Sequence, residues 1–350
     1  AGVFTDINAG LEGTADGTAA WGDYDNDGDL DLVLAGYNNG AYISRIYRND
    51  GGLFTNINAS LTGVAEAALA WGDYDNDGDL DLVLTGRESG SNVKSSRIYR
   101  NNNGVFTDIG AGLVGVNEGS VAWGDYDNDG DLDLALQGEQ SGSPTMGIRR
   151  IYRNEGGTFM PFLPFTDKLP EVYAGAMAWG DYDNDGDLDF ISAGINDAST
   201  TLAQLWRNNT TNANTAPTAP TGLEVTNINL SDVVLSWNRA SDTETPQPGL
   251  SYNVVIGTTT ADISVQSPMA DVTTGYRRIP TLGSEYQSTR AIISGLVEGT
   301  TYYWSVQAID GAYAGSAFAT TGSFVHQPKF RPVTTNIIVP VRNSSVAWGD

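Results

Sequence analysis

One eleven-residue string, Trp-Gly-Asp-Tyr-Asp-Asn-Asp-Gly-Asp-Leu-Asp, occurs four times in this chain of 350 residues. The copies begin at Trp21, Trp71, Trp123 and Trp179, so that successive copies are 50, 52 and 56 residues apart. A fifth copy begins at Trp348 and runs as far as Asp350. A repeat of this length means that the chain folds as a series of similar units, in which neighbouring units bury each other's apolar faces.

Each unit offers four short segments with the composition of β-strands. The first enters the Trp-Gly-Asp sequence, and the second follows the string as an alternating Leu-Asp-Leu segment that ends at a glycine. The third and fourth segments recur at 46–49, 98–101, 151–154 and 205–208, and at 4–7, 54–57, 106–109 and 165–168. Four strands in about 50 residues is the size of one β-propeller blade, whereas solenoid repeats are usually shorter. The sequence therefore predicts an all-β fold of β-propeller blades, each with four antiparallel strands.

A second domain interrupts the array. The polar linker 211–221 is rich in Thr, Asn and Pro, and the aspartate-rich string is absent from the hundred residues that follow it. Strand-like segments at 223–225, 233–237, 252–256, 291–293, 302–308 and 321–325 favour a β-sandwich. This block, 222–327, resembles a fibronectin type III domain in Trp237 and in the segment from Gly295 to Tyr302. The resemblance implies that Trp237 fills the core and that the Tyr302 hydroxyl makes a corner hydrogen bond.

The register of the repeats indicates where the array resumes. Phenylalanine and tryptophan are 17 residues apart in the first three units, and Phe330 and Trp348 are 18 apart. Lys329–Val333 is therefore expected to supply the fourth strand of the last unit, which would insert the sandwich in a hairpin loop of that unit. The expected organisation is a repeat array over 1–210, the linker, the sandwich, and an incomplete resumption of the array over 328–350.

The aspartates of the string are the candidate metal ligands. Carboxylates at positions 1, 3, 5, 7 and 9 of a loop with glycine at position 6 suit Ca²⁺, which takes 6–8 oxygen ligands at about 2.3–2.6 Å. The loop lacks the nitrogen and sulfur that zinc or copper prefer, and an EF-hand would need a glutamate where Leu34 stands. About four calcium ions per chain are expected, and the candidate residues are Asp23, Asp25, Asp27, Asp29, Asp31, Asp73, Asp75, Asp77, Asp79, Asp81, Asp125, Asp127, Asp129, Asp131, Asp133, Asp181, Asp183, Asp185, Asp187 and Asp189. Within the first loop, the side chain of Asp29 is expected to face solvent and its carbonyl to bind the ion.

With these loops the repeats resemble FG-GAP/VCBS repeats, the blades of the integrin α-subunit propeller and of many secreted bacterial proteins. The resemblance covers 1–210 and 328–350. It implies calcium in the loop between the first two strands of each blade. Combined with the sandwich, it implies a bacterial protein that is exported to the cell surface.

Composition narrows the possible partners. The formal charge is −25, and 20 of the 43 acidic residues belong to the four loops. Such a charge repels nucleic acid and anionic membranes. The chain has no cysteine and a single histidine, His326, which is expected to be solvated, and it has no apolar run of membrane-spanning length. Arg48, Arg100, Arg153 and Arg207 recur in phase and are expected to pack between blades or bridge loops.

These features favour a secreted, calcium-stapled protein of the cell surface that serves adhesion, ligand binding or extracellular assembly. Its partner would be a protein, a glycan or further copies of itself. Two alternatives remain open: a polysaccharide lyase or hydrolase on a calcium propeller, and a structural subunit of an extracellular fibre or sheath. We expect no enzyme, because no carboxylate pair, histidine pair or nucleophile motif stands apart from the repeat.

Overall fold

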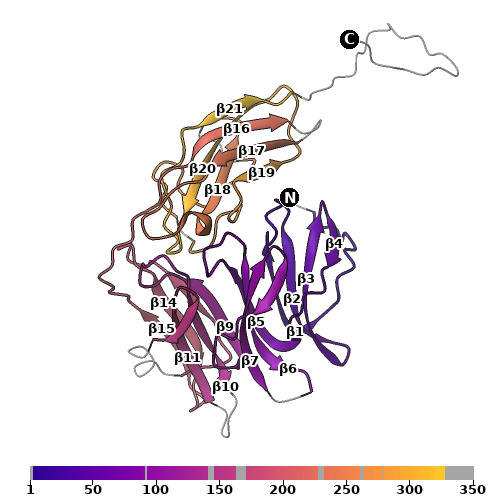
Figure 1. The fold of residues 1–350 in the computed structure, drawn as a ribbon, viewed down its shortest axis with the longest axis vertical. Helices are drawn as coiled ribbons and strands as arrows, with labels where there is room; N and C mark the ends of the chain where they lie inside the picture. The colour runs from indigo at the N-terminus through magenta and orange to yellow at the C-terminus, as the bar shows by residue number, and fades with distance from the viewer. Residues whose placement is uncertain are drawn as a thin grey trace, which may run out of the picture.

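The repeats and the sandwich both fold into antiparallel β-sheets (Figure 1). The computed structural model describes residues 3–90, 93–140, 146–162, 171–227, 232–260, 264–277 and 279–327. Within these ranges the only helical element is the short 3-10 turn η1, Gln247–Gly249. The expected all-β class is confirmed.

Each aspartate-rich string lies in the first hairpin of one repeat, and the single pair Ile43–Val64 joins the strands of repeats I and II into one eight-stranded sheet. Repeat I comprises β1 (Ala15–Gly22), β2 (Asp31–Asn38), β3 (Ala41–Asp50) and β4 (Leu53–Asn56). Repeat II comprises β5 (Val64–Gly72), β6 (Asp81–Glu88), β7 (Lys94–Asn102) and β8 (Val105–Asp108). Repeat III comprises β9 (Val116–Gly124), β10 (Asp133–Gln140), β11 (Met146–Glu155) and β12 (Thr158–Pro161). The described part of repeat IV comprises β13 (Met177–Gly180), β14 (Asp189–Ile195) and β15 (Thr201–Trp206).

Strands within a repeat pair in chain order, and neighbouring repeats pack face to face. The first strands form a succession in which β1 contacts β5, β5 contacts β9, and β9 contacts β13. Alternating residues of the second and third strands, such as Val83 and Ile98, are fully buried between two sheets. The hydrophobic cores therefore lie between the repeats, as expected for units that cannot bury a core alone.

The Phe-Thr segments differ from the prediction at both ends of the array. Phe54 and Phe106 lie in the fourth strands β4 and β8, as expected, but the equivalent residue of repeat III is Phe159 in β12. Phe165–Lys168, which the sequence analysis put in this role, lies outside the described residues. Residues 3–14 form no strand, and Phe4 is fully exposed. The fourth strand expected at Lys329–Val333, like all of 328–350, also lies outside the described residues.

Two three-stranded sheets form the sandwich. One contains β16 (Thr221–Asn227), β17 (Val233–Asn238) and β19 (Arg290–Ile293), and the other contains β18 (Ser251–Gly257), β20 (Thr301–Ile309) and β21 (Gly322–Val325). Trp237 and Trp304 pack in the core between the sheets, with ring centroids 6.5 Å apart. The Tyr302 hydroxyl accepts a hydrogen bond of 2.9 Å from the amide of Val297, as expected of a tyrosine corner. His326 is fully buried, so its predicted solvent exposure is wrong.

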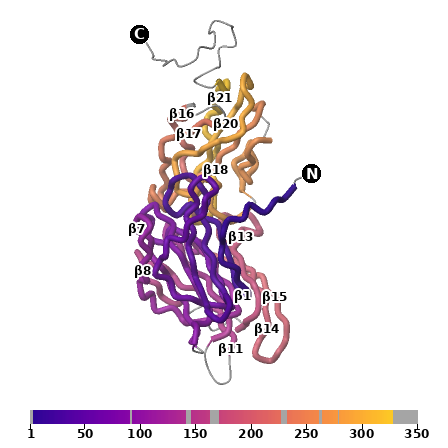
Figure 2. Tube along the Cα trace, turned by 90° about the vertical axis from the view of Figure 1, so that its right-hand side faces the viewer, coloured from indigo at the N-terminus to yellow at the C-terminus, as the bar shows by residue number. Residues whose placement is uncertain are grey.

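The sandwich stands on one end of the repeat array (Figures 1 and 2). Two tyrosine hydroxyls of the sandwich donate to carbonyls at the ends of first strands: Tyr286 to Trp21 at 3.0 Å, and Tyr313 to Trp123 at 2.8 Å. A cavity of about 640 Å³ lies between the first strands and these sandwich loops. The aspartate loops sit at the same end, because they follow the first strands directly.

Candidate metal centres in the aspartate loops

Each aspartate loop is a tight turn whose backbone suits asparagine and glycine. In repeat I, Asn26 has a φ of 58° and Gly28 a φ of 96°, and the same two positions have positive φ in the other three repeats. Asparagine tolerates the left-handed region better than most residues do, and glycine enters it without steric cost. This turn brings the alternate aspartates of the string to one side.

The first and last aspartates of each loop are fixed by backbone amides. In repeat I, the two carboxylate oxygens of Asp23 accept from the amides of Asp27 and Gly28, each at 3.1 Å. The oxygens of Asp31 accept from Tyr24 at 3.1 Å and from Asn49 at 2.8 Å. The same bonds recur in the other repeats. Both carboxylates are therefore positioned before any ion binds.

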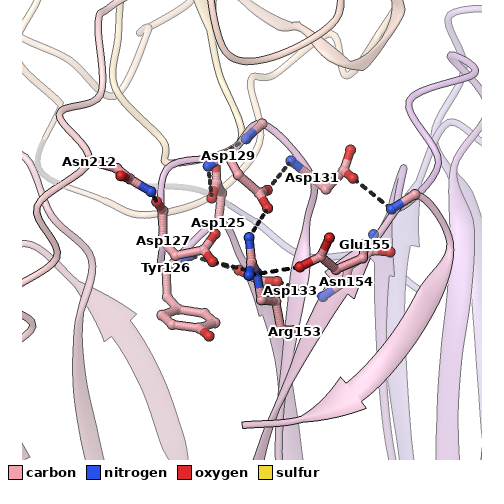
Figure 3. A network of polar contacts seen from close by, with 12 residues as sticks. Asp125, Tyr126, Asp127, Asp129, Asp131, Asp133, Arg153, Asn154, Glu155 and Asn212 are labelled. Atoms are coloured by element: carbon pink, nitrogen blue, oxygen red, sulfur yellow. Dashed lines mark hydrogen bonds and ion pairs between the residues drawn. The ribbon is translucent and has the colours of Figure 1, made fainter.

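Three carboxylates converge in every loop. Their ligand oxygens lie within 4.8 Å of one another in four groups: Asp23, Asp25 and Asp27; Asp73, Asp75 and Asp81; Asp125, Asp127 and Asp133; and Asp181, Asp183 and Asp189. Figure 3 shows the group of repeat III with the contacts around it. Positions 1 and 3 belong to the group in all four loops, joined by position 5 in repeat I and by position 9 in the others.

One buried oxygen in every loop lacks a hydrogen-bond partner. It is Oδ1 of the position-3 aspartate, namely Asp25, Asp75, Asp127 and Asp183. A buried polar atom without a partner is costly, so its recurrence in all four loops points to a missing partner of positive charge. An oxygen-only ligand set of this kind fits a hard cation such as Ca²⁺.

Burial also disfavours the ionised form of these carboxyl groups. It raises the pKa of Asp23 to about 7, that of Asp73 to about 8 and that of Asp81 to about 9. The pKa of Asp133 is likewise raised well above its usual value by burial. A bound cation would offset this cost, because it favours the charged carboxylates.

The position-7 aspartates point to neighbouring backbone groups instead of the convergent group. Asp29 accepts from the amide of Gly51 at 2.6 Å, Asp79 from Asn103 at 3.0 Å, and Asp131 from Gly156 at 2.9 Å. The position-5 carboxylates accept hydrogen bonds from the backbone amide two residues further on, within the same turn. For example, Asp77 accepts from the amide of Asp79 at 3.0 Å. Of the twenty candidate aspartates, the structure thus brings together three in each loop.

The in-phase arginines differ between repeats. Arg153 contacts Asp127 at 2.6 Å and Asp129 at 3.0 Å, and Arg207 contacts Asp183 at 2.9 Å and Asp185 at 2.7 Å. Arg48 pairs instead with Asp50 at 2.9 Å, two residues further along the same strand. In repeats III and IV the arginine therefore bridges the third strand to the loop.

Asparagines link the four loops into one row. The Nδ2 of Asn26 donates to the Gly78 carbonyl at 3.0 Å, and that of Asn76 donates to the Gly130 carbonyl at 3.1 Å. Asn128 reaches Asp187 at 3.0 Å in the same way. These asparagines had no predicted role, although their recurrence at position 4 of every loop is the sequence signal that could have revealed it.

Sandwich loops cover this row of loops. The amide of Asp125 donates to the Gly311 carbonyl at 3.2 Å, and the Tyr276 hydroxyl donates to Asn184. A Cβ built at Gly130 would lie 1.9 Å from the carbonyl oxygen of Glu244, so the two backbones are in close contact there. The sandwich and the candidate metal centres thus share one interface.

Comparison with known families identifies both parts of the chain. The profile of FG-GAP-like repeats matches residues 23–84 and 73–136, and that of the fibronectin type III domain matches 218–321. No curated protein matches the chain. Among solved structures, "Crystal structure of chicken CNTN1 FN1-FN3 domains" aligns with 88% of this chain and 97% of that chain, at 9% identity and a TM-score of 0.24. The chain therefore contains FG-GAP-like repeats and a fibronectin type III domain.

Domains of these two kinds are typically interaction modules of extracellular proteins and are typically non-catalytic. Within the described ranges, no helix is long and apolar enough to cross a membrane.

Proposed function

We propose that this chain, which combines FG-GAP-like repeats with a fibronectin type III domain, is part of a secreted adhesion or ligand-binding protein whose repeats are held by calcium. One Ca²⁺ would bind each aspartate loop. The observation that carries the proposal is the buried, unpartnered Oδ1 of the position-3 aspartate in all four loops. The expected partners are a protein or glycan at the cell surface, or further copies of the chain.

The ions would serve as structural staples. In repeats II, III and IV the convergent group joins the end of the first strand to the start of the second, whereas in repeat I it lies within the loop; the asparagines join each loop to the next. A cation in each group would therefore stabilise the hairpin of one repeat and, through the asparagines, its packing on the next. Four ions would offset eight of the negative charges that lie in these loops.

Single aspartate variants of repeat III test the metal assignment. Asp127→Asn removes a charged ligand from the convergent group and is expected to lower the calcium count from four to three per chain. Asp131→Asn is the matched control, because Asp131 lies in the same loop but contacts the amide of Gly156 and the side chain of Asn76. The count is measured by mass spectrometry of bound metal after dialysis. Equal counts in Asp127→Asn and in the unchanged chain would overturn the assignment.

Adhesion is tested with beads that carry the chain. Beads are incubated with immobilised matrix proteins and glycans in calcium or in excess chelator. Retention that requires calcium, and that falls when all four position-3 aspartates are changed to asparagine, would support the proposal. Failure of the beads to bind any surface, or release of reducing ends from a polysaccharide by the purified chain, would contradict it.

A further inference from the structure

Repeat IV has an open face where repeats I, II and III are each covered by the next repeat. The tyrosine that follows the first aspartate of the loop is at most 8% exposed in those three repeats, namely at Tyr24, Tyr74 and Tyr126. Its equivalent in repeat IV, Tyr182, is 53% exposed. Ile191 and Leu205 are 49% and 52% exposed, although their equivalents in the other repeats are buried. This is the surface of a sheet that lacks a neighbour among the described residues.

The covered faces show what such a neighbour looks like. A tryptophan of the next repeat stacks on each buried tyrosine: Trp71 on Tyr24, Trp123 on Tyr74, and Trp179 on Tyr126, with centroids 6.2–6.4 Å apart. The indole Nε1–H of Trp123 donates to the Ala70 carbonyl at 3.3 Å, and that of Trp179 to the Ala122 carbonyl at 3.3 Å. Every covered face therefore receives the first strand of the next repeat.

A glycine marks the place where each tryptophan sits. A Cβ built at Gly22, Gly72 or Gly124 would lie 2.6–2.8 Å from Cδ1 of the next repeat's tryptophan. The equivalent in repeat IV is Gly180, and a Cβ built there meets nothing within 4 Å among the described residues. A cleft of about 750 Å³ lies beside Gly180 and Tyr182, with Tyr276 and Ile279 of the sandwich on its other side.

The chain itself carries a fifth copy of the segment that fills this position. Residues 345–350, Ser-Val-Ala-Trp-Gly-Asp, are identical to residues 120–125, which end the first strand of repeat III and include Trp123. We propose that Ser345–Asp350 packs on the open face of repeat IV as the first strand of a fifth unit. By analogy with Trp123 and Trp179, Trp348 would then stack on Tyr182, cover Gly180 and donate its indole Nε1–H to the carbonyl of Ala178.

The connecting segment is long enough to reach this face. Val325 pairs with Thr301 at the start of β20, and Gly311, which follows the other end of β20, contacts Asp125 in repeat III. The sandwich therefore separates the two ends by about 30 Å, at roughly 3.3 Å per strand residue. The 20 residues from His326 to Ser345 span up to about 65 Å when extended.

Hydroxyl-radical footprinting tests the proposal, because it measures the solvent exposure of individual side chains. In the unchanged chain, Tyr182 and Trp348 should be labelled several-fold more slowly than Trp21, whose side chain is 52% exposed and meets no preceding repeat among the described residues. Trp348→Ala should restore rapid labelling of Tyr182. Gly180→Ala should do the same, since its Cβ would occupy the space of the indole.

Gly13→Ala is the matched control, because a Cβ there also meets nothing within 4 Å and no copy of the tryptophan string is expected beside it. It should leave the labelling of Tyr182 unchanged. Equal labelling of Tyr182 in the unchanged chain and in Trp348→Ala would overturn the proposal. Protection of Tyr182 that disappears on dilution would also overturn it, because a second copy would then be the occupant. The proposal does not depend on calcium, so the footprinting is done with and without chelator.

Discussion

The ring of Tyr74 in repeat II lies nearly parallel to the indole of Trp123 in repeat III, with centroids 6.4 Å apart and planes inclined by 15°. Phe159 packs against both rings, at 5.5 Å from Tyr74 and 5.9 Å from Trp123. Tyr74 follows the first aspartate of one string, and Trp123 opens the next string. The string therefore supplies both rings of this contact between neighbouring repeats, which we call the joint, as well as the candidate metal ligands.

The glycine after each tryptophan leaves room for this joint. In Gly124→Ala the new Cβ would lie 2.8 Å from Cδ1 of Trp179, too close for two carbon atoms. We expect a loss of about 1–3 kcal/mol of stability, as for other overpacked cores. Urea unfolding followed by circular dichroism measures the loss, and Gly13→Ala is the control. Equal stability of the two variants would contradict the described joint.

The asparagine at the end of the third strand makes a second contact between repeats. The Nδ2 of Asn154 donates to the Tyr74 carbonyl of the preceding repeat at 2.7 Å and to the Leu132 carbonyl of its own at 3.1 Å. Asn154→Ala removes the hydrogen-bond donor to both buried carbonyls. We therefore expect the free energy of unfolding to fall by about 1–3 kcal/mol.

Asn49→Ala is the control for that variant. Asn49 occupies the same position in repeat I and bonds to Leu30 of its own repeat at 3.0 Å, but it has no preceding repeat to contact among the described residues. Asn49→Ala should therefore lower the free energy of unfolding clearly less than Asn154→Ala does in the same measurement. A larger cost at Asn49 would count against the proposed role of Asn154.

The contact between the sandwich and the repeats predicts a measurable effect of one hydroxyl. Tyr313→Phe removes the hydroxyl that donates to the Trp123 carbonyl. We expect this variant to be less stable than the unchanged chain by about 0.5–1.5 kcal/mol. Tyr37→Phe, at an exposed side chain, serves as the control. Differential scanning calorimetry compares the two variants. An unchanged transition in Tyr313→Phe would show that this hydrogen bond does not contribute to stability.

Calcium affinity should rise with pH. In the metal-free chain, burial raises the pKa of Asp73 to about 8 and that of Asp81 to about 9, and calcium binds only the ionised form. Between pH of about 4 and 9, these carboxyl groups bind more protons in the metal-free folded chain than in the unfolded chain. The stability that they contribute to the metal-free fold at low pH is therefore lost as the pH rises through their pKa values in the folded chain.

Calorimetric titrations at pH 6 and pH 8.5 measure this dependence. Tighter binding at the higher pH, with release of protons at the lower pH, is expected. Chelation should therefore destabilise the chain more at pH 8.5 than at pH 6. An affinity that is the same at both values would contradict the assignment of buried carboxylates as ligands.

The sequence predicted the order of the first three strands in every repeat, and of the fourth in repeats I to III, because the string places turn residues and alternating apolar residues at fixed offsets. It could not distinguish Phe159 from Phe165, since both follow the Tyr-Arg-Asn segment at a plausible distance and only the pairing of β12 with β11 decides between them. The burial of His326 also depends on a long-range contact, because its amide bonds to the carbonyl of Thr300.

The candidate site was predictable in residue type but not in detail. Spacing alone gave five aspartates per loop, whereas the backbone turn decides that Asp131 faces Gly156 and that Asp127 joins Asp125 and Asp133. The position of the sandwich over the loops could not be predicted, because its contacts, such as Tyr313 with Trp123, join residues that are 190 positions apart.

The most direct test of the central claim is thermal unfolding of the chain in saturating calcium and in excess chelator, with bound metal counted on the same sample. The account predicts about four calcium ions per chain and a fall of the melting temperature by ten degrees or more on chelation, since ligands that bind only the folded state stabilise it. A chain that binds no calcium and melts at the same temperature in both solutions would contradict it.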